Sequence, residues 1–552
     1  MDTDGGLDLK MPKLFSQSHD VQRAMAFVLF ALPPVVFVCV APLVVPDTND
    51  DTFIFLRIAR NMLQGYGPVY NPGERVEVYS SPLWLALLTL TGSLFSVVQE
   101  PARFAPLAQG LSTLCVVGTY VVLFLEVRRH TKSMMWALWA GWCLLLFPIS
   151  LVWARAGMDA SLAALLVACL LGQTAGRFSS LRWHRIYASL LVWTRPEGIA
   201  WVLVLSVLRF RSRGLRESAK DLLWPALSFA TLLTTRRAWF GQWLPNTYFA
   251  KRGRGVEFYQ EGASYALQFL VEHFAWLIML GAAVAMLRLR GAKAVPGLAS
   301  CLAFCLVQVG LVALEGGDFL WYQRLLYPVL APLLLVGASA FAGISSRSTS
   351  RMRLASAAVA LAYFGLTATE ALSGELVVRA QEVHRKHRSE ALAAQIVAST
   401  LGPDESLAVG PAGRLVYEAA PRAAYDFYGL VELDVARAPA IAGRPGHRRF
   451  SAELLLARRP DFVVFTTSPS WSPPCAFLGP GAFPPVRPSD SNPIPTNLLV
   501  HSALSQGYQI VLVPTSAQSA KRLYLPLLAS PEAFSRIRRV PLLRLHELCS
   551  TL

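Results

Sequence analysis

Charged residues are scarce in this chain. They account for 16% of its 552 residues, whereas soluble proteins typically carry about 25%. This shortage excludes an ordinary soluble enzyme. Hydrophobic residues account for 54% of the chain, and they recur in runs close to the length that crosses a bilayer as a helix. The sequence therefore predicts a polytopic α-helical membrane protein.

The chain also lacks the usual signs of a metal site built from cysteine and histidine. It contains no CxxC motif and no His/Cys spacing typical of zinc binding. Six of its eight cysteines lie inside apolar runs, where cysteine usually serves as a small core residue. The other two, Cys475 and Cys549, lie in the C-terminal region, and the sequence leaves open whether they pair.

Positive charges exceed negative charges by 16 at pH 7. Lys and Arg fall in short clusters between apolar runs, which indicates membrane topology rather than nucleic-acid binding. The polar segment 1–23 lacks a cleavable-signal pattern and is expected to be a cytoplasmic tail. About eleven spans are predicted, at 24–46, 105–126, 134–153, 159–175, 186–194, 197–208, 222–236, 264–287, 296–314, 325–344 and 354–372. The apolar segment 82–97 is short and is expected at the membrane interface.

A charged tripeptide, Arg195-Pro196-Glu197, divides the apolar stretch 186–208. Proline disrupts a helix, and two charges at the bilayer centre would be costly. The chain is therefore expected to turn here at the outer surface. With this turn, the basic loops fall on one side, which should be cytoplasmic. The acidic motifs fall on the other side: Asp50-Asp51, Arg155 to Asp159, Arg195 to Glu197, Leu244 to Tyr248 and Glu315 to Asp318.

The composition changes near residue 375, where charges, prolines and short β-rich runs begin. The pattern predicts an α/β domain over 375–552, after a membrane domain over 24–374. An odd number of spans after a cytoplasmic tail places this domain outside the cytoplasm. Strands are expected at 406–409, 424–427, 461–465 and 508–513, and helices at 383–400 and 448–459.

Asp50 and Asp51 stand where the first span should meet water. Carboxylates at such a position are costly to desolvate, so a function is the favoured explanation. One of them could act as a general base, or either could instead cap the helix that starts near Thr52. Asp47 adds a third acid, so a divalent cation such as Mg²⁺ or Mn²⁺ is an open alternative, and no cofactor is assigned.

Other polar residues are predicted on the same side of the membrane. The guanidinium of Arg195 could bind a lipid phosphate or could simply pair with Glu197. Lys251 and Arg324 are the alternative phosphate ligands. Further polar residues expected along the same cleft are Arg75, Glu77, Tyr79, Glu315 and Asp318, and Arg236-Arg237 stands beside the outer loop against the positive-inside rule, where it could meet a phosphate.

Several of these segments resemble a known family. Segments 50–54, 57–61, 65–67, 69–77 and 82–84 resemble the N-terminal signature of the mycobacterial terminal β-arabinofuranosyltransferases and their wider bacterial relatives. The resemblance spans roughly 47–464 and continues, in the same order, through 195–198, 244–251, 316–318 with Arg324, 445–447 and 457–464.

This chain departs from the family pattern at two places. Gly157-Met158-Asp159 stands where a Glu is expected in the third position, so a carboxylate is kept. Gly410-Pro411-Ala412-Gly413 stands where relatives often have Gly-Asp-Ala-Gly, so an acid is lost.

The resemblance implies the C-type glycosyltransferase fold. It implies an enzyme of the bacterial inner membrane that moves a sugar, for example arabinofuranose, from a polyprenyl-phosphate donor to a glycan or glycolipid of the cell envelope. The active site, centred on the first outer loop 47–81, and the C-terminal domain would face away from the cytoplasm. The alternative is a lipid or solute transporter or flippase, which would more often place polar residues near the midplane.

The placement of polar residues on one side of the membrane and the family resemblance together give the residues expected to form the site. Asp50 is the expected base, and Asp51 is expected to position the substrate. The expected substrate-binding residues are Arg75, Asp159, Arg195, Glu197, Asn246, Tyr248, Lys251, Asp318 and Arg324.

Overall fold

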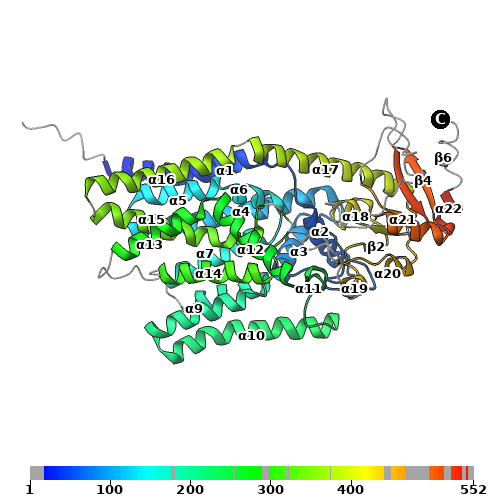
Figure 1. Ribbon diagram of the computed structural model, residues 1–552, viewed down its shortest axis with the longest axis horizontal. Helices are drawn as coiled ribbons and strands as arrows, with labels where there is room; N and C mark the ends of the chain where they lie inside the picture. Colours follow the sequence, from blue (N-terminus) through cyan, green and yellow to red (C-terminus); the bar gives the residue numbers. More distant parts are fainter. Residues whose placement is uncertain are drawn as a thin grey trace, which may run out of the picture.

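The protein has a long helical bundle at one end and a sheet domain at the other (Figure 1). The computed structural model describes residues 18–175, 181–253, 255–288, 298–318, 320, 322–347, 349–372, 374–439, 449–467, 496–514, 524–537 and 543–544. The predicted tail 1–17, the segment 445–447 of the family resemblance, Cys475 and Cys549 lie outside these residues.

Each predicted span coincides with a helix or a pair of helices. The bundle contains α1 (Ser18–Val44), α4 (Phe104–Thr131), α5 (Met134–Leu146), α6 (Pro148–Ala156), α7 (Ala160–Ala175), α8 (Leu181–Thr194), α9 (Gly198–Arg213), α10 (Leu215–Phe240), α12 (Gly255–Glu272), α13 (Ala275–Arg288), α14 (Leu298–Leu314), α15 (Leu330–Arg347) and α16 (Ser350–Ala371). Shorter elements lie toward the sheet: α2 (Asp50–Leu63), α3 (Pro82–Leu94), η1 (Pro101–Arg103), α11 (Asn246–Lys251) and η2 (Arg324–Val329). The predicted helical segments are thus confirmed as helices.

The helices differ in their ability to cross a bilayer alone. Within the described residues, four helical segments are long and apolar enough to do so, and two bent pairs would raise the number to six. The four are Val21–Val44, Pro101–Thr131, Arg324–Ser345 and Ser350–Thr400. The total of about eleven spans stays a prediction.

Two predicted continuous spans are broken in the structure. The segment 134–153 bends by 58° between α5 and α6, where Pro148 is the first residue of α6. Proline is tolerated in a first helical turn but has no N–H to continue the preceding helix. The segment 264–287 bends by 73° between α12 and α13, where Phe274 has a φ of +51° and so ends the helix. In contrast, the predicted break at residues 195–197 is confirmed, because α8 ends at Thr194 and α9 begins at Gly198.

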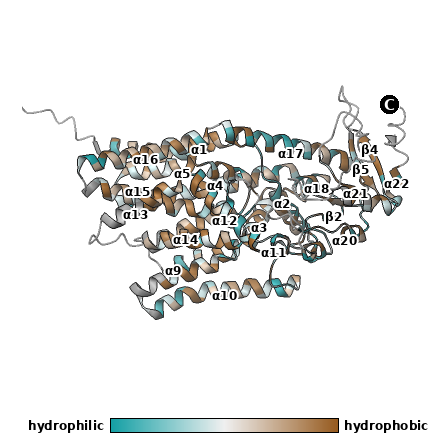
Figure 2. Ribbon diagram, viewed as in Figure 1, coloured by the Kyte–Doolittle hydropathy of each residue, from teal (hydrophilic) through white to brown (hydrophobic). Residues whose placement is uncertain are grey.

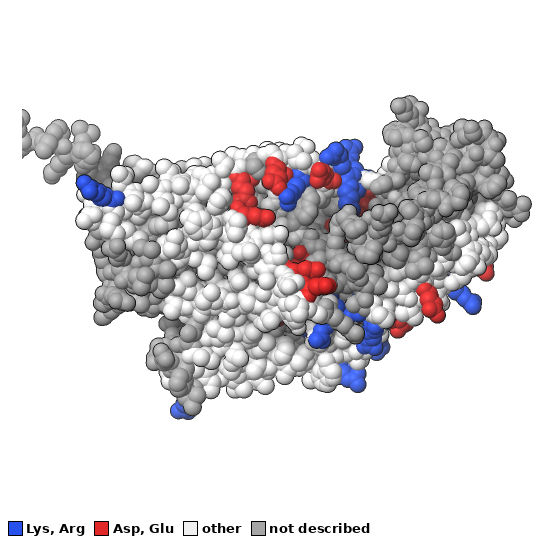
Figure 3. Space-filling model, in the orientation of Figure 1, with Lys and Arg blue, Asp and Glu red and all other residues white. Residues whose placement is uncertain are grey.

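The outer faces of the bundle are apolar. On α1, the side chains of Val21, Phe27 and Val35 are all exposed, and Leu354 and Leu361 are exposed on α16. Figure 2 shows the hydrophobic character of these helices, and Figure 3 shows few charged residues on this end of the face that it presents. Water would disfavour so large an apolar surface, whereas lipid would not. The protein is a multi-pass helical membrane protein.

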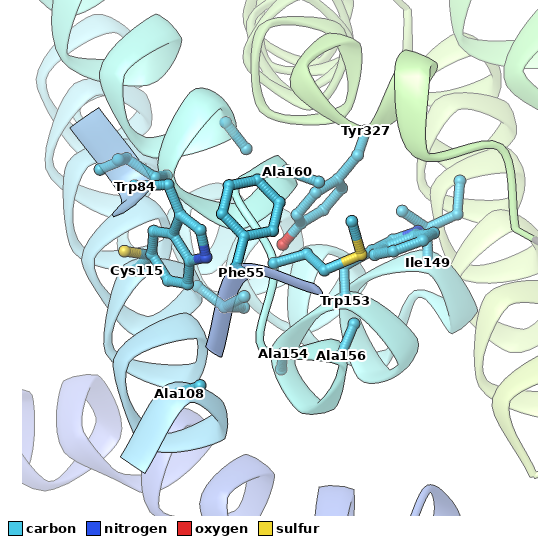
Figure 4. Packing of buried hydrophobic residues seen from close by; sticks show 14 of the residues in the cluster. Phe55, Trp84, Ala108, Cys115, Ile149, Trp153, Ala154, Ala156, Ala160 and Tyr327 are labelled. Atoms are coloured by element: carbon cyan, nitrogen blue, oxygen red, sulfur yellow. The ribbon is translucent and has the colours of Figure 1, made fainter. Parts of the chain in front are cut away.

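A buried aromatic cluster lies beneath the helix ends that face the sheet domain. Figure 4 shows Trp84, Phe55, Trp153 and Tyr327 within it. The indole N–H of Trp84 donates to the carbonyl of Gly157 (3.2 Å), and that of Trp153 donates to the carbonyl of Tyr322 (2.8 Å). These bonds hold in place the turn at Gly157 and the loop that contains Tyr322.

The C-terminal region is joined to the bundle by α17 (Gly374–Thr400) and contains one mixed six-stranded sheet in the order β2-β1-β3-β5-β4-β6. Parallel pairing joins β1 (Ser406–Val409), β2 (Ala423–Asp426) and β3 (Phe462–Val464), and antiparallel pairing joins β4 (Gln509–Pro514), β5 (Tyr524–Ala529) and β6 (Leu543–Arg544). The helices of this region are α18 (Arg414–Ala419), α19 (Leu433–Arg437), α20 (Ala452–Ala457), α21 (Thr496–Ser505) and α22 (Pro531–Ile537).

The four predicted strands agree with β1 to β4 to within a residue or so, whereas β5 was not predicted. Its sequence contains Pro526, a residue that usually marks a segment as non-strand, here opposite Leu512 of β4. The predicted helix 448–459 is shorter in the structure, where α20 covers Ala452–Ala457.

The loop after α2 fastens the sheet domain to the bundle. The Asn71 side chain donates to the Ala424 carbonyl and accepts from the Ala424 N–H, both at 2.9 Å. The Tyr70 hydroxyl donates to the carbonyl of Ala412 (2.6 Å), and Arg57 donates to the carbonyl of Pro421 (3.1 Å). Much of the motif in 57–77 therefore holds the two parts of the molecule together.

Candidate functional site

A cavity of about 1110 Å³ lies where the helix ends of the bundle meet α11 and α19. Its polar lining includes side chains from the start of α2, the turns before α7 and α9, the end of α14 with η2, and α11. Arginines from α10, from α19 and from the segment before α20 complete it. Charged side chains gather in this middle region of the molecule (Figure 3). The charged residues that line the cavity are Asp51, Asp159, Arg195, Glu197, Arg236, Lys251, Arg252, Glu315, Asp318, Arg324, Arg437 and Arg449.

Arg324 links two carboxylates in the cavity wall. Its Nη1 lies 3.5 Å from Oδ2 of Asp51, and its Nε pairs closely with Oδ2 of Asp318. Burial raises the pKa of Asp318, but Arg324 and Lys251 outweigh burial, so that this pKa lies below its usual value. Asp318 is therefore a carboxylate that compensates Arg324. The remaining side of the Arg324 guanidinium is directed at Asp51.

Arg195 is also held by carboxylates. Its Nε lies 3.1 Å from Oδ2 of Asp159, and its Nη1 lies 3.7 Å from Oε1 of Glu197. The ion pair with Glu197 was one of the two interpretations of the Arg195-Pro196-Glu197 motif. The structure adds Asp159 as the nearer partner. All three side chains line the cavity, so pairing does not remove Arg195 from the site.

Lys251 brings a second kind of cation to the cavity. It is the last residue of α11, and its ammonium has no hydrogen bond or ion pair with any residue that the structure describes. Burial and the nearby Arg324 lower its pKa, while Asp318 and Asp51 oppose them. An enclosed ammonium without a bonded partner is a suitable ligand for an anion.

Glu315 is a cavity residue that was noted in the sequence but not assigned a role. Burial, reinforced by the negative charge of Glu197, raises its pKa to about 8, and Arg195 opposes this rise. The Glu315-Gly316-Gly317-Asp318 motif was the available signal. Both glycines have positive φ, +79° and +70°, so the turn requires their conformational freedom.

Asp50 faces away from the cavity. Its Oδ1 accepts the N–H of Arg414 at 2.7 Å, and a Cβ on Gly413 would lie only 2.4 Å from the same oxygen. Burial raises the pKa of Asp50 to about 6, and the Arg414 N–H opposes this rise. Asp50 thus joins α2 to the start of α18. The residue that caps α2 is Asn49, whose side chain accepts the N–H of Asp51 at 2.9 Å, so neither aspartate serves as this cap.

Two other residues expected to bind substrate also lie outside the cavity lining. The Asn246 amide is buried and donates to the carbonyls of Gly429 (2.8 Å) and Leu430 (2.9 Å). The Arg75 guanidinium stacks over the ring of Trp239 at 5.1 Å. Of the predicted substrate-binding set, the cavity brings together Asp159, Arg195, Glu197, Tyr248, Lys251, Asp318 and Arg324.

The three acids near α2 do not converge as metal ligands. Oδ2 of Asp47 lies 2.5 Å from Nδ1 of His384, whereas Asp50 and Asp51 face Arg414 and Arg324. Within the described part of the chain, no group of three or more His, Cys, Asp or Glu side chains is arranged to hold a metal ion.

Arg236 also has a partner of its own. Its Nε lies 2.9 Å from the carboxylate of Glu77, and both side chains are buried. Burial raises the pKa of Glu77 to about 7, and Arg236 opposes this rise. The pair fixes the loop beneath Asn246, whose N–H donates to the Glu77 carbonyl at 2.9 Å. The sequence left open whether Arg236 could meet a phosphate; the structure pairs it with Glu77 and places it in the cavity lining.

Comparisons with known proteins bear on both the sequence and the fold. Over 328 residues, the chain is 26% identical to the terminal β-(1→2)-arabinofuranosyltransferase of Corynebacterium glutamicum; this covers 52% of the chain and 47% of that protein. Over 80 residues it is 40% identical to the protein of the same name from Mycobacterium tuberculosis, covering 14% of the chain and 12% of that protein. The chain thus spans about half the length, or less, of these curated relatives.

The solved structures extend the likeness to nearly the whole chain. ArnT from Cupriavidus metallidurans, bound to undecaprenyl phosphate, matches with a TM-score of 0.53 and 14% identity over 91% of this chain and 97% of ArnT. Its apo form matches with a TM-score of 0.53 and 16% identity, over 91% of this chain and 98% of ArnT. Residues 378–524 match a family model described as "Domain of unknown function (DUF8728)". The chain therefore has the C-type glycosyltransferase fold of ArnT and is a sequence relative of the terminal β-(1→2)-arabinofuranosyltransferases.

Proposed function

We propose that this protein is an integral-membrane glycosyltransferase that moves a sugar from a polyprenyl-phosphate donor to a glycan or glycolipid of the cell envelope. The observation that carries the proposal is the cavity, which both Asp51 and Lys251 line, and in which the Lys251 ammonium has no hydrogen bond or ion pair with a described residue. The names of the sequence relatives make arabinofuranose the first sugar to test.

In the proposed reaction, Asp51 is the base. It removes the proton from the acceptor hydroxyl as that oxygen bonds to the anomeric carbon. The bond between the anomeric carbon and the phosphate oxygen breaks, and polyprenyl phosphate leaves. Arg324 positions Asp51, to which it lies at 3.5 Å, while Asp318 compensates the buried guanidinium. Asp51 takes the role because it faces the cavity, whereas Asp50 faces α18.

Lys251 is the proposed ligand of the donor phosphate. The leaving phosphate gains negative charge during the reaction, and a fixed cation in an enclosed site stabilises that charge. Arg195 lies in the same wall but shares its charge with Asp159 and Glu197. It is the second candidate for this role. The structure with undecaprenyl phosphate is a structure of ArnT, and it supports a lipid phosphate as the class of ligand to test here.

A transporter is the competing proposal. The cavity is lined by helix ends and turns, including the break between α8 and α9 and the turn after α14, and these lie at the end of the bundle that meets the sheet domain. A site at the end of a bundle suits a reaction with an acceptor that arrives from one side. A transported solute would instead need a site near the midplane that opens to both sides.

We further propose that the cavity and the sheet domain face away from the cytoplasm in the inner membrane. The turn between α9 and α10, which carries basic residues, lies at the opposite end of the bundle (Figure 1). A membrane-impermeant maleimide applied to intact spheroplasts should label Glu453→Cys on the sheet domain. It should label Arg216→Cys in the basic turn only after permeabilisation. The reverse pattern would refute this orientation.

The function is tested with purified protein in liposomes that contain labelled polyprenyl-phosphate sugars. Donors with arabinofuranose and with a hexose are compared, each with extracted envelope glycans as acceptors. We expect label in the glycan and release of polyprenyl phosphate, both absent from Asp51→Asn. Movement of intact donor between leaflets without transfer to any acceptor would favour the transporter.

A further inference from the structure

Two carboxyl groups in the cavity have no part in the proposed reaction. Glu197 comes from the break between α8 and α9, and Glu315 comes from the end of α14. Both line the same space as Asp51 and Lys251. They approach closely enough for the charge of Glu197 to affect the ionisation of Glu315. Two carboxyl groups that influence each other in this way call for an explanation, because they would repel each other if both were ionised.

The position of Glu315 is fixed by steric constraints in its turn. A Cβ on Gly316 would lie 2.1 Å from the ring of Phe258, and one on Gly317 would lie 2.8 Å from Cβ of Tyr265. The backbone N–H of Glu315 still donates to the Leu311 carbonyl at 2.9 Å. The two glycines let the turn after α14 pack this closely against α12. The turn therefore holds Glu315 at the cavity.

The two side chains differ in how they are bound. Glu197 pairs with Arg195, which Asp159 holds from its other side. The carboxyl group of Glu315 has no hydrogen bond or ion pair with any described residue, and this exposed side chain lines the cavity. Its raised pKa, about 8, leaves it largely protonated at neutral pH. Glu315 then offers one O–H donor as well as acceptor oxygens, whereas the Glu197 carboxylate accepts only.

This combination matches the chemistry of a sugar ring. A sugar hydroxyl both donates and accepts hydrogen bonds, so a neutral carboxyl beside a carboxylate can engage neighbouring hydroxyls in both senses. The turn that carries Glu315 continues directly to Asp318, which contacts Arg324 and influences Lys251. A donor whose phosphate is bound at Lys251 would therefore lie in the cavity whose wall also contains Glu197 and Glu315.

We propose that Glu197 and Glu315 form the subsite that binds the hydroxyls of the transferred sugar and so select the donor. This assignment rests on the proposed function. It is supported by the position of both glutamates in the cavity that Lys251 also lines, where the Lys251 ammonium bonds to no described residue. The two glutamates recognise the ring, and the phosphate is recognised elsewhere in the cavity.

The test compares two ligands that differ only by the sugar: a polyprenyl-phosphate sugar and polyprenyl phosphate. Their Kd values are measured for full-length protein in nanodiscs. Glu315→Ala and Glu197→Ala should each weaken binding of the sugar-bearing lipid by roughly 2- to 12-fold, the effect of one hydrogen bond. Binding of polyprenyl phosphate should be unchanged. Glu315→Gln should keep the wild-type Kd for both, because an amide also donates and accepts.

Glu257→Gln is the matched control, since Glu257 is an exposed glutamate on α12 outside the cavity lining. If Glu315→Ala does not fold, Glu315→Ser serves with the same expectation. Equally weakened binding of both lipids would overturn the subsite. Unchanged binding of both lipids would also overturn it. Failure of the wild-type protein to bind either lipid would instead refute the proposed function, so the two failures are distinguishable.

Discussion

Asp50 and Asp51 are neighbours in the chain, but their carboxylates point to different sides of α2 and contact different partners. Oδ1 of Asp50 accepts the N–H of Arg414 at 2.7 Å, whereas Oδ2 of Asp51 lies 3.5 Å from Nη1 of Arg324. Successive residues on a helix point about 100° apart, which follows from roughly 3.6 residues per turn. One aspartate therefore contacts the sheet domain while the other reaches the cavity.

This division predicts different outcomes for the two aspartates. Asp51→Asn should lower kcat by about 10²- to 10⁴-fold, because the proposed base is lost. Asp50→Ala should keep most of the turnover but should lower thermal stability, because the Arg414 N–H loses its acceptor and an unsatisfied buried N–H costs about 1–3 kcal/mol. Single-turnover transfer assays and melting curves in detergent measure the two effects. Loss of turnover in Asp50→Ala alone, with Asp51→Asn active, would reverse the assignment.

The sequence was sufficient to locate the helices and to gather the polar residues. Hydrophobic runs predicted the helices and Arg195-Pro196-Glu197 predicted the break, because each depends on local composition. The acids and Lys251 converge because their turns lie at one end of the bundle. The placement of these turns at one end can be predicted by counting hydrophobic segments and basic loops, without knowledge of how the helices pack.

The partner of each polar side chain could not be predicted in the same way. Asp50 faces away from the cavity because Arg414, 364 positions later, docks against it. Asn246 is occupied by the carbonyls of Gly429 and Leu430, which also lie far along the chain. Such contacts depend on how the sheet domain is placed. The signature residues therefore looked catalytic in the sequence, although several serve to dock that domain.

Arg195 is tested through its nearer partner. Arg195→Ala should lower stability by about 3–5 kcal/mol, because the buried carboxylate of Asp159 loses its compensating charge. The double variant Arg195→Ala with Asp159→Asn should regain much of that stability. If Arg195 is only structural, the double variant should also regain donor affinity. Donor affinity that stays low in the double variant, despite restored melting temperature, would assign Arg195 to the phosphate.

Asn71 provides a test of how the sheet domain is held. Asn71→Ala removes both 2.9 Å hydrogen bonds to Ala424, so the N–H and the carbonyl of Ala424 lose their Asn71 partner. Each orphaned group should cost about 1–3 kcal/mol, so the melting temperature and resistance to proteolysis should fall. Gln64→Ala is the control, since Gln64 is exposed in the same loop. Equal effects of the two substitutions would contradict the docking role.

Lys251 links donor binding to pH. Burial and Arg324 lower the pKa of its ammonium, while Asp318 and Asp51 oppose them. As the pH rises, Lys251 should lose its charge earlier than an ordinary lysine, whose pKa is about 10.4. The attraction for the donor phosphate is then lost, so the donor Kd should increase at a pH below the usual range of lysine titration.

Lys251→Arg tests whether the increase in donor Kd with pH comes from the loss of charge on Lys251. A guanidinium stays protonated throughout this range, so Lys251→Arg combined with Glu315→Gln should show no rise in Kd with pH. Lys251→Ala should bind the donor weakly at every pH. Glu315 also titrates, with a pKa of about 8, and its effect should persist in Lys251→Arg and disappear in Glu315→Gln. The same rise in Kd for the wild type and for Lys251→Arg would mean that another group controls phosphate binding.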